Sequence, residues 1–165
     1  SSGLIKGDGS SIQKHDLVPG FSASGQDVWL KEAIFHEPGL VLSAVGARCG
    51  KVFEATGNWG VVANTVVLMP QKNFNPHYLW YLVNREDFWE KGGSAQPYVR
   101  VPETLQKKVF MPLYSKQQEI ADFLDRETNR IDAIIGKCRE SVELLRERRQ
   151  ALITAAVTGE LEVAA

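Results

Sequence analysis

One cysteine and three histidines are the side chains best suited to nucleophilic or general-base chemistry in this sequence. Cys49 lies in the segment ARCGK, and the histidines are His15, His36 and His77. A cysteine nucleophile needs a base within hydrogen-bonding reach, but no spacing predicts that a histidine meets Cys49, and ARCGK fits a β-turn equally well. No segment matches the glycine-rich phosphate loop with its Lys-Ser or Lys-Thr ending, and no paired metal ligands occur. We therefore expect no catalytic residue, no cofactor and no metal site in this chain, and an enzyme is a disfavoured alternative.

The composition is that of one folded, soluble domain. The 165 residues are 44% hydrophobic and 24% charged, which excludes general disorder. No apolar run approaches the roughly 20 residues that a membrane span needs, and no signal peptide is recognisable at the start of the sequence. Cys49 and Cys138 are too far apart for a metal or redox motif, which suits a reducing compartment. We expect a cytoplasmic protein that does not contact a membrane.

Charge indicates no particular partner. The formal net charge is −1, with five Lys and Arg against six Asp and Glu in residues 1–60. Residues 116–165 carry eight against ten, and only residues 61–115 are positive, with six against four. A nucleic-acid-binding domain with a basic face usually shows a larger excess. If this chain binds DNA, the placement of its cations must matter more than their number.

Short valine-rich segments, bounded by Gly, Pro and Asn, predict strands. They are GLVLSAV at 39–45, KVFEA at 51–55, GVVANTVVLMP at 60–70 and a closing strand, KVFMPL, at 108–113. Asn64 and Thr65 lie in the middle of the third segment, where polar side chains need a reason.

A helix is predicted at 75–93, between the third strand segment and the fourth. Asn75 is placed to cap it, Pro76 suits its first turn, and Gly92 and Gly93 would end it. Its buried stripe would be formed by Tyr78, Leu79, Leu82 and Val83.

A much longer helix is predicted at 115–159. Ser115 and Gln118 have the spacing of a capping box, Gly159 suits the C-cap, and only Gly136 interrupts the helical run. Apolar residues recur every seven positions and predict a seam for a second helix; the seam residues are Leu124, Ile131, Ile135, Cys138, Val142, Leu145 and Leu152. At 1.5 Å per residue the helix is roughly 60 Å long, so the domain cannot cover it. The expected fold is α+β: a β-rich domain at 1–114, a coiled-coil helix at 115–159 and a tail at 160–165.

These segments resemble a known family. The run at 117–161, QQEIADFLDRETNRIDAIIGKCRESVELLRERRQALITAAVTGEL, is similar to the closing conserved helix of the DNA-specificity (S) subunit of type I restriction–modification enzymes. The preceding domain is similar to a target recognition domain of that family in the segments GDGSSIQKHDL, LVLSAVGARCGKVF, NTVVLMP, NPHYLWYLV and GGSAQPYVRVPETLQKKVFMPL. The resemblance covers nearly the whole chain, and the ending RRQALITAAVTGEL is its most specific part.

The resemblance implies a non-catalytic reader of double-stranded DNA. In the family, two recognition domains are held apart by an antiparallel helix pair, along which methyltransferase subunits dock; a restriction (motor) subunit can join. S-adenosylmethionine would belong to the methyltransferase partner and not to this chain. One recognition domain and one helix are present here, so the chain is either part of a longer subunit or a half-length form that pairs with a second copy of itself.

Three glycine-flanked loops supply most of the residues expected to contact DNA, because they combine close backbone approach with hydrogen-bonding side chains, and the mid-strand pair Asn64 and Thr65 supplies the rest. Gln96 is suited to adenine and an arginine to guanine. The candidate residues are Ser10, Ser11, Gln13, Lys14, Arg48, Lys51, Asn64, Thr65, Ser94, Gln96, Tyr98 and Arg100.

One alternative function stays open beside DNA recognition. The chain could be a coiled-coil dimer whose β-rich domain binds a protein or another ligand, in which case no salt-dependent binding to duplex DNA is expected. The helix also carries Arg146, Arg148 and Arg149, which are interleaved with Glu143 and Glu147 and therefore fit a solvated face better than a DNA contact. Cys138 is expected to be a buried seam residue.

Overall fold

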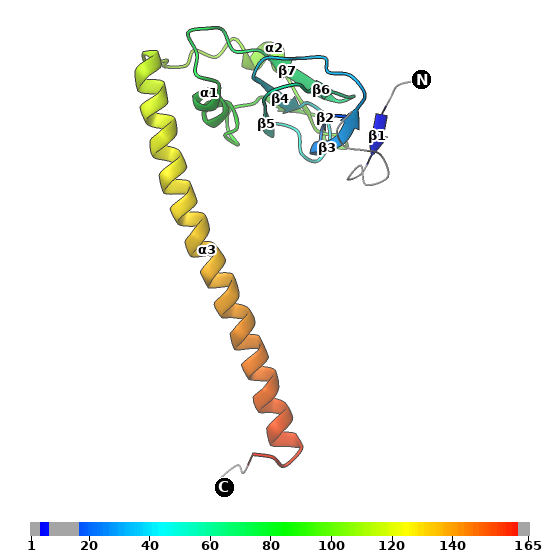
Figure 1. The fold of residues 1–165 in the computed structure, drawn as a ribbon, viewed down its shortest axis with the longest axis vertical. Coiled ribbons are helices and arrows are strands. Elements are labelled where there is room, and N and C mark those ends of the chain that lie inside the picture. The colour runs from blue at the N-terminus through cyan, green and yellow to red at the C-terminus, as the bar shows by residue number, and fades with distance from the viewer. Residues whose placement is uncertain (1–3, 7–16, 162–165) are drawn as a thin grey trace. The chain divides into compact units, whose positions relative to one another are not determined.

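The computed structural model describes residues 4–6 and 17–161 of the chain (Figure 1). The contacts between residues divide the chain into two units, residues 1–121 and residues 122–165. Within the described residues the first unit contains every strand and the second contains most of the long terminal helix. The α+β class predicted from the sequence is confirmed.

A three-stranded antiparallel sheet forms the centre of the first unit. Its middle strand is fully buried, and its order is β5 (Val52–Ala55), β4 (Gly39–Ser43), β7 (Thr65–Leu68). Leu40 lies opposite Leu68 and Ser43 lies opposite Thr65. The register therefore places the end of β4 beside the beginning of β7.

A second sheet has four strands and both strand directions. Its order is β1 (Leu4–Lys6), β3 (Gly25–Leu30), β2 (Val18–Ser22), β6 (Gly60–Val61). The β1–β3 and β2–β3 pairs are antiparallel, whereas β2 and β6 are parallel. A short hairpin and two helices complete the first unit's secondary structure: β8 (Lys91–Gly92), β9 (Tyr98–Val99), α1 (Pro76–Val83) and α2 (Val101–Thr104).

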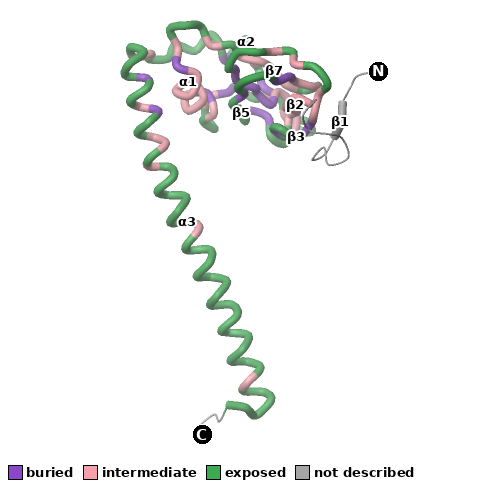
Figure 2. Tube along the Cα trace, viewed as in Figure 1, coloured by how far each residue is buried: buried purple, intermediate pink, exposed green. Residues whose placement is uncertain are grey.

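The core lies on both faces of the central sheet (Figure 2). Leu40 and Leu42 of β4 pack with Val83 of α1 in one cluster. Val41, whose side chain alternates to the opposite face, packs with Trp59 in the other. A strand covered on both faces must be apolar throughout, which is why GLVLS was recognisable from the sequence.

Helix α1 starts as predicted but ends early. The Asn75 side-chain oxygen accepts a hydrogen bond from the Tyr78 amide at 2.9 Å, and Pro76 is the first helical residue. The helix ends at Val83, far short of the predicted Gly92. Tertiary contacts fix that end, because the Val83 carbonyl accepts the indole N–H of Trp89 at 2.6 Å.

The predicted buried stripe of this helix is only partly right. Val83 is buried, whereas Tyr78, Leu79 and Leu82 are half-buried. The helix therefore packs on the sheet through a face whose other apolar side chains remain partly exposed to solvent.

Two strand predictions need correction. The segment 60–70 is not one strand, because a turn at Asn64 separates β6 from β7, and Asn64 has a φ of +67°. The segment 108–113 forms no strand in the described structure. Its large apolar side chains are exposed, with Phe110 at 86% and Leu113 at 82%, so its apolar pattern does not come from a buried strand face.

Helix α3 (Tyr114–Val157) has 44 residues and is about 66 Å long at 1.5 Å per residue. Gly159, with a φ of +77°, follows its end, as expected for a left-handed C-cap. Only Gln117 and Ala121 are buried, and the later turns are mostly exposed (Figure 2). Cys138 is also exposed, so this chain alone does not provide the predicted burial. Within the described residues, no helix is long and apolar enough to cross a membrane.

Candidate nucleic-acid interface

The end of β4 is the point at which three of the four predicted DNA-contacting segments meet. Ser43 and Ala44 use their main-chain groups to bind all three. The Ala44 N–H donates to the Asn64 carbonyl at 2.9 Å, and the Ala44 carbonyl accepts from the Val99 N–H at 2.8 Å. The Ser43 carbonyl accepts from the Gly50 N–H at 2.9 Å. We call this meeting point the β4 end.

The first segment, GARCGK at 46–51, is a tight turn. The Cys49 N–H donates to the Gly46 carbonyl at 2.9 Å, and the Lys51 N–H donates to the Arg48 carbonyl at 3.0 Å. The side chains of Arg48 and Lys51 are exposed, whereas Cys49 is buried in the core. The turn therefore presents two cations at its surface and uses its cysteine for packing.

The second segment, 93–100, belongs to the β8–β9 hairpin. The Gly46 N–H donates to the Pro97 carbonyl at 2.8 Å, so the hairpin and the first segment are joined by their backbones. Gly93 has a φ of +78°, and a Cβ there would lie 2.3 Å from the Gln96 carbonyl oxygen. Only glycine fits this position without moving the backbone, and the turn exposes Ser94 and Gln96.

Tyr98 and Arg100 lie over Gly92 on the same hairpin. A Cβ on Gly92 would stand 2.8 Å from the Tyr98 ring carbon Cζ and 2.9 Å from Arg100 Nε. Both side chains are exposed. The hairpin thus presents an aromatic ring and a guanidinium close together, beside the exposed polar groups of its turn.

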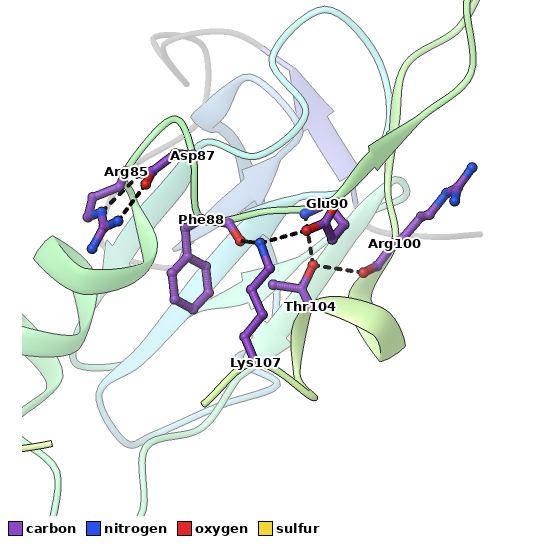
Figure 3. A network of polar contacts seen from close by, with 7 residues as sticks. All are labelled: Arg85, Asp87, Phe88, Glu90, Arg100, Thr104 and Lys107. Atoms are coloured by element: carbon purple, nitrogen blue, oxygen red, sulfur yellow. Dashed lines mark hydrogen bonds and ion pairs between the residues drawn. The ribbon is translucent and has the colours of Figure 1, made fainter. Parts of the chain in front are cut away.

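A polar network holds the two ends of this hairpin (Figure 3). The Arg100 N–H donates to the Glu90 carbonyl at 2.7 Å. The buried Thr104 hydroxyl donates to the Arg100 carbonyl at 2.8 Å and accepts from the Glu90 N–H at 2.9 Å. Lys107 Nζ donates to the Phe88 carbonyl and pairs with Glu90 Oε1, both at 2.8 Å. The hydrogen bond from Lys107 lowers the pKa of the Glu90 carboxyl. Figure 3 shows the Arg100 guanidinium extending away from this network.

The third segment is the turn at Asn64 and Thr65. The Thr65 hydroxyl donates to the Val62 carbonyl at 2.6 Å, and Thr65 is half-buried. Asn64 is exposed in a left-handed conformation that asparagine tolerates well. The interpretation of Asn64 as a polar position within a strand was wrong, since it lies in the turn before β7, whereas Thr65 is the first residue of that strand. Their contact with DNA stays a prediction.

The fourth segment carries Ser10, Ser11, Gln13 and Lys14, and it lies outside the described residues. Among the residues considered for catalysis, His15 also lies outside them. His36 Nδ1 is 2.8 Å from Asn58 Oδ1, and His77 Nδ1 is 2.7 Å from Glu54 Oε1.

Two cations near the β4 end were not singled out from the sequence. Lys91 of β8 and Arg85, which follows α1, line a pocket of about 500 Å³ together with Arg48 and Lys51. Neither has a motif around it that distinguishes it from an ordinary surface cation. The four cations come together only when folding brings the turn at 46–51 next to the segment 84–91.

Comparison with known proteins identifies a family for this chain. Residues 25–144, well over half of the chain, match the family "Type I restriction modification DNA specificity domain". The chain is 25% identical over 157 residues to the type I restriction enzyme EcoDI specificity subunit of Escherichia coli, covering 93% of this chain and 35% of that subunit. It is 25% identical over 130 residues to the EcoprrI specificity subunit of Escherichia coli, covering 72% of this chain and 32% of that one.

The chain spans about a third of the length of these curated relatives. The family assignment made from the sequence is confirmed by this match. The chain belongs to the family of type I restriction modification DNA specificity domains.

Proposed function

We propose that residues 1–114 read one half of a double-stranded DNA target, and that the loops at the β4 end make the contacts. The observation that carries this proposal is the joining of the 46–51 turn, the Asn64 turn and the 93–100 hairpin by main-chain hydrogen bonds to Ser43 and Ala44. Loops tied to one rigid strand keep a fixed spacing, which base-edge recognition requires.

The chemistry of these loops suits DNA. Exposed Arg48, Lys51 and Arg100 supply charge for phosphates, and exposed Gln96 supplies a paired donor and acceptor for a base edge. The near-neutral net charge is compatible with this role because the cations gather at one end of the central sheet.

Replacing Gln96 by alanine tests the base-reading role. Wild-type protein is first used to select bound duplexes from a randomised pool, and affinities for the selected and a shuffled duplex are then measured by fluorescence anisotropy. We expect Gln96→Ala to lose about 1–3 kcal/mol of discrimination between the two duplexes, because the hairpin would lose a bidentate base contact.

Gln106→Ala is the matched control, since Gln106 is also exposed but follows α2, outside the three loops. This control should discriminate like the wild type. Unchanged discrimination by Gln96→Ala would remove the hairpin turn from base reading, and an absence of any salt-dependent duplex binding by the wild type would contradict the proposed function.

We propose that residues 115–159 form the spacer, paired antiparallel with the same helix of a second copy of the chain, and that residues 160–165 are a tail. Its apolar side chains support this proposal, because water covers them in the single chain: Ile131 and Ile134 are 54% exposed and Leu145 is 64% exposed. A helix of about 66 Å is somewhat under two turns of B-DNA, at about 34–36 Å each, which suits two half-sites on one face of the duplex.

Leu145→Arg should separate the two copies. Each leucine buried at the seam contributes about 1.5–3 kcal/mol, and a symmetric pair contains two, so we expect dimerisation to weaken by a factor of about 100 or more. Sedimentation equilibrium measures the mass.

Gln150→Arg adds the same charge on the other side of the helix, five residues or about 140° away, and it should leave the mass unchanged. A Leu145→Arg protein with the mass of the wild-type dimer would contradict the seam.

The partners of the proposed assembly follow from the family. We propose that methyltransferase subunits dock on the paired helices and bring S-adenosylmethionine with them, and that a restriction subunit can join through these subunits. This chain would recognise the DNA target sequence, and the partner would carry out the methyl transfer. Co-purification of a tagged chain with a methyltransferase subunit would test this arrangement.

A further inference from the structure

Four of the ten residues that line the pocket beside the β4 end are cations. Arg48 and Lys51 enter it from the 46–51 turn, and Arg85 and Lys91 enter it from the segment that follows α1. Glu86 is the one carboxylate on its wall. We call this feature the basic pocket; its volume is about 500 Å³.

The four cations of the basic pocket differ in whether a carboxylate neutralises their charge. Arg85 binds Asp87 through two hydrogen bonds, of 3.0 and 2.5 Å, so much of its charge is compensated. Arg48 donates one guanidinium N–H to the Ser24 carbonyl at 2.6 Å and keeps its full charge. Within the described part of the chain, Lys51 and Lys91 form no ion pair with a carboxylate. The pocket therefore has three cations without a carboxylate partner, Arg48, Lys51 and Lys91, and one carboxylate, Glu86, among its described lining residues.

The Lys91 side chain passes close to the backbone of Gly50. Gly50 has a φ of +92°, and a Cβ there would lie 2.9 Å from Lys91 Cε and 3.2 Å from its Nζ. The absence of a side chain at Gly50 therefore lets the lysine lie across the 46–51 turn. The Lys91 ammonium group therefore lies beside that turn, close to the backbone of Gly50.

The pocket is continuous with the proposed DNA-reading loops. Lys91 is the first residue of β8 and leads into the hairpin that carries Gln96. Arg48 and Lys51 belong to the turn whose Gly46 N–H binds the Pro97 carbonyl of the same hairpin. An anion in the pocket would therefore lie next to the groups proposed to reach base edges.

We propose that the basic pocket binds one backbone phosphate of the DNA duplex, with Lys91 and Lys51 as its charge partners and Arg48 as a hydrogen-bond donor. This inference rests on the proposed function and assigns affinity and sequence discrimination to different parts of the site. The pocket supplies affinity that does not depend on sequence, and the hairpin supplies sequence discrimination.

Lys91→Gln and Lys51→Gln, made separately, test the inference. Binding to the selected duplex and to a mixed-sequence duplex is measured by anisotropy at several salt concentrations. For each variant we expect affinity for both duplexes to fall by the same factor and the slope of log affinity against log salt to decrease by about 1. Discrimination between the duplexes should not change.

Lys72→Gln is the matched control. Lys72 is also exposed, but it follows the Leu68 end of β7, whereas the pocket lies by the Thr65 end. It should retain the wild-type slope. Circular dichroism melts of all variants confirm that they are folded.

The outcomes distinguish failure of the pocket from failure of the proposed function. A wild type that binds duplexes while both lysine variants keep its slope overturns the pocket and leaves the DNA-reading role intact. A wild type that binds no duplex overturns both. Titration with pyrophosphate distinguishes the source of the phosphate: binding of pyrophosphate by the wild type, with duplex affinity unaffected by either substitution, assigns the pocket to a free phosphate compound and overturns the proposal.

Discussion

Trp59→Ala is expected to lower the free energy of unfolding of the strand-containing unit by about 3–5 kcal/mol, the cost of removing a large buried aromatic side chain. Trp59 is completely buried. Its ring stacks on Phe35 at 4.4 Å between centroids and meets the edge of Phe21 at 6.0 Å. Its indole N–H donates to the Glu37 carbonyl at 2.9 Å. The substitution would leave a cavity where β6 meets the central sheet, and urea unfolding followed by circular dichroism measures the loss.

Trp59→Phe separates the packing from the hydrogen bond. It keeps a ring against Phe35 and removes the bond to the Glu37 carbonyl, which lies on an exposed residue and can be solvated. We expect a smaller loss, of about 1–2 kcal/mol. If Trp59→Ala stays within about 1 kcal/mol of the wild type, the second core cluster does not stabilise the unit as its burial indicates.

Gln117→Ala should also lower the free energy of unfolding of the strand-containing unit, because this buried side chain joins the start of α3 to the start of α1. Gln117 is 1% exposed. Its Oε1 accepts the Asn75 N–H at 2.8 Å, and its Nε2 donates to the Pro112 carbonyl at 2.9 Å. Alanine would leave a buried amide and a carbonyl without these partners and would open a cavity. Each unpaired buried group costs about 1–3 kcal/mol, so we expect a loss of about 2–4 kcal/mol.

Gln118→Ala is the control for that substitution. Gln118 is the next residue and accepts a hydrogen bond from Asn75 Nδ2 at 2.5 Å, but it is exposed, so water can replace it. We expect a loss below about 1 kcal/mol. Amide hydrogen exchange gives an independent reading, since Gln117→Ala should speed exchange at Asn75 far more than Gln118→Ala. Equal effects of the two substitutions would show that burial at Gln117 is unimportant.

The fold was predictable from the sequence where the signal was local. Asn75 followed by Pro76 predicts a helix start because the cap and the fixed proline φ act within one turn, and the long helix shows its heptads without any knowledge of neighbours. The β2–β3 hairpin was not predicted. Its strands include Pro19, Gly20 and exposed polar residues, and they are stabilised by pairing with each other and with distant β6.

The residues of the candidate site were likewise predictable only where the sequence around them carried a local signal. Arg48 and Gln96 could be selected because glycine-rich turns surround them, although nothing local showed that the two turns are joined at Gly46 and Pro97. Lys91 was missed because an exposed lysine is an ordinary surface residue until packing places it across Gly50. Gln117 was missed for the opposite reason, since a glutamine in a charged helix is usually solvated, and its burial depends on Asn75 more than forty residues earlier.

The way the recognition loops are fastened at the β4 end has a consequence for how target preference can diverge. Ser43 and Ala44 hold these loops through amide and carbonyl groups, which every amino acid except proline possesses. The exposed side chains at the loop tips take no part in that fastening. Substitutions at those side chains would leave the main-chain hydrogen bonds intact, so under the proposed function the DNA target could change while the scaffold stays the same.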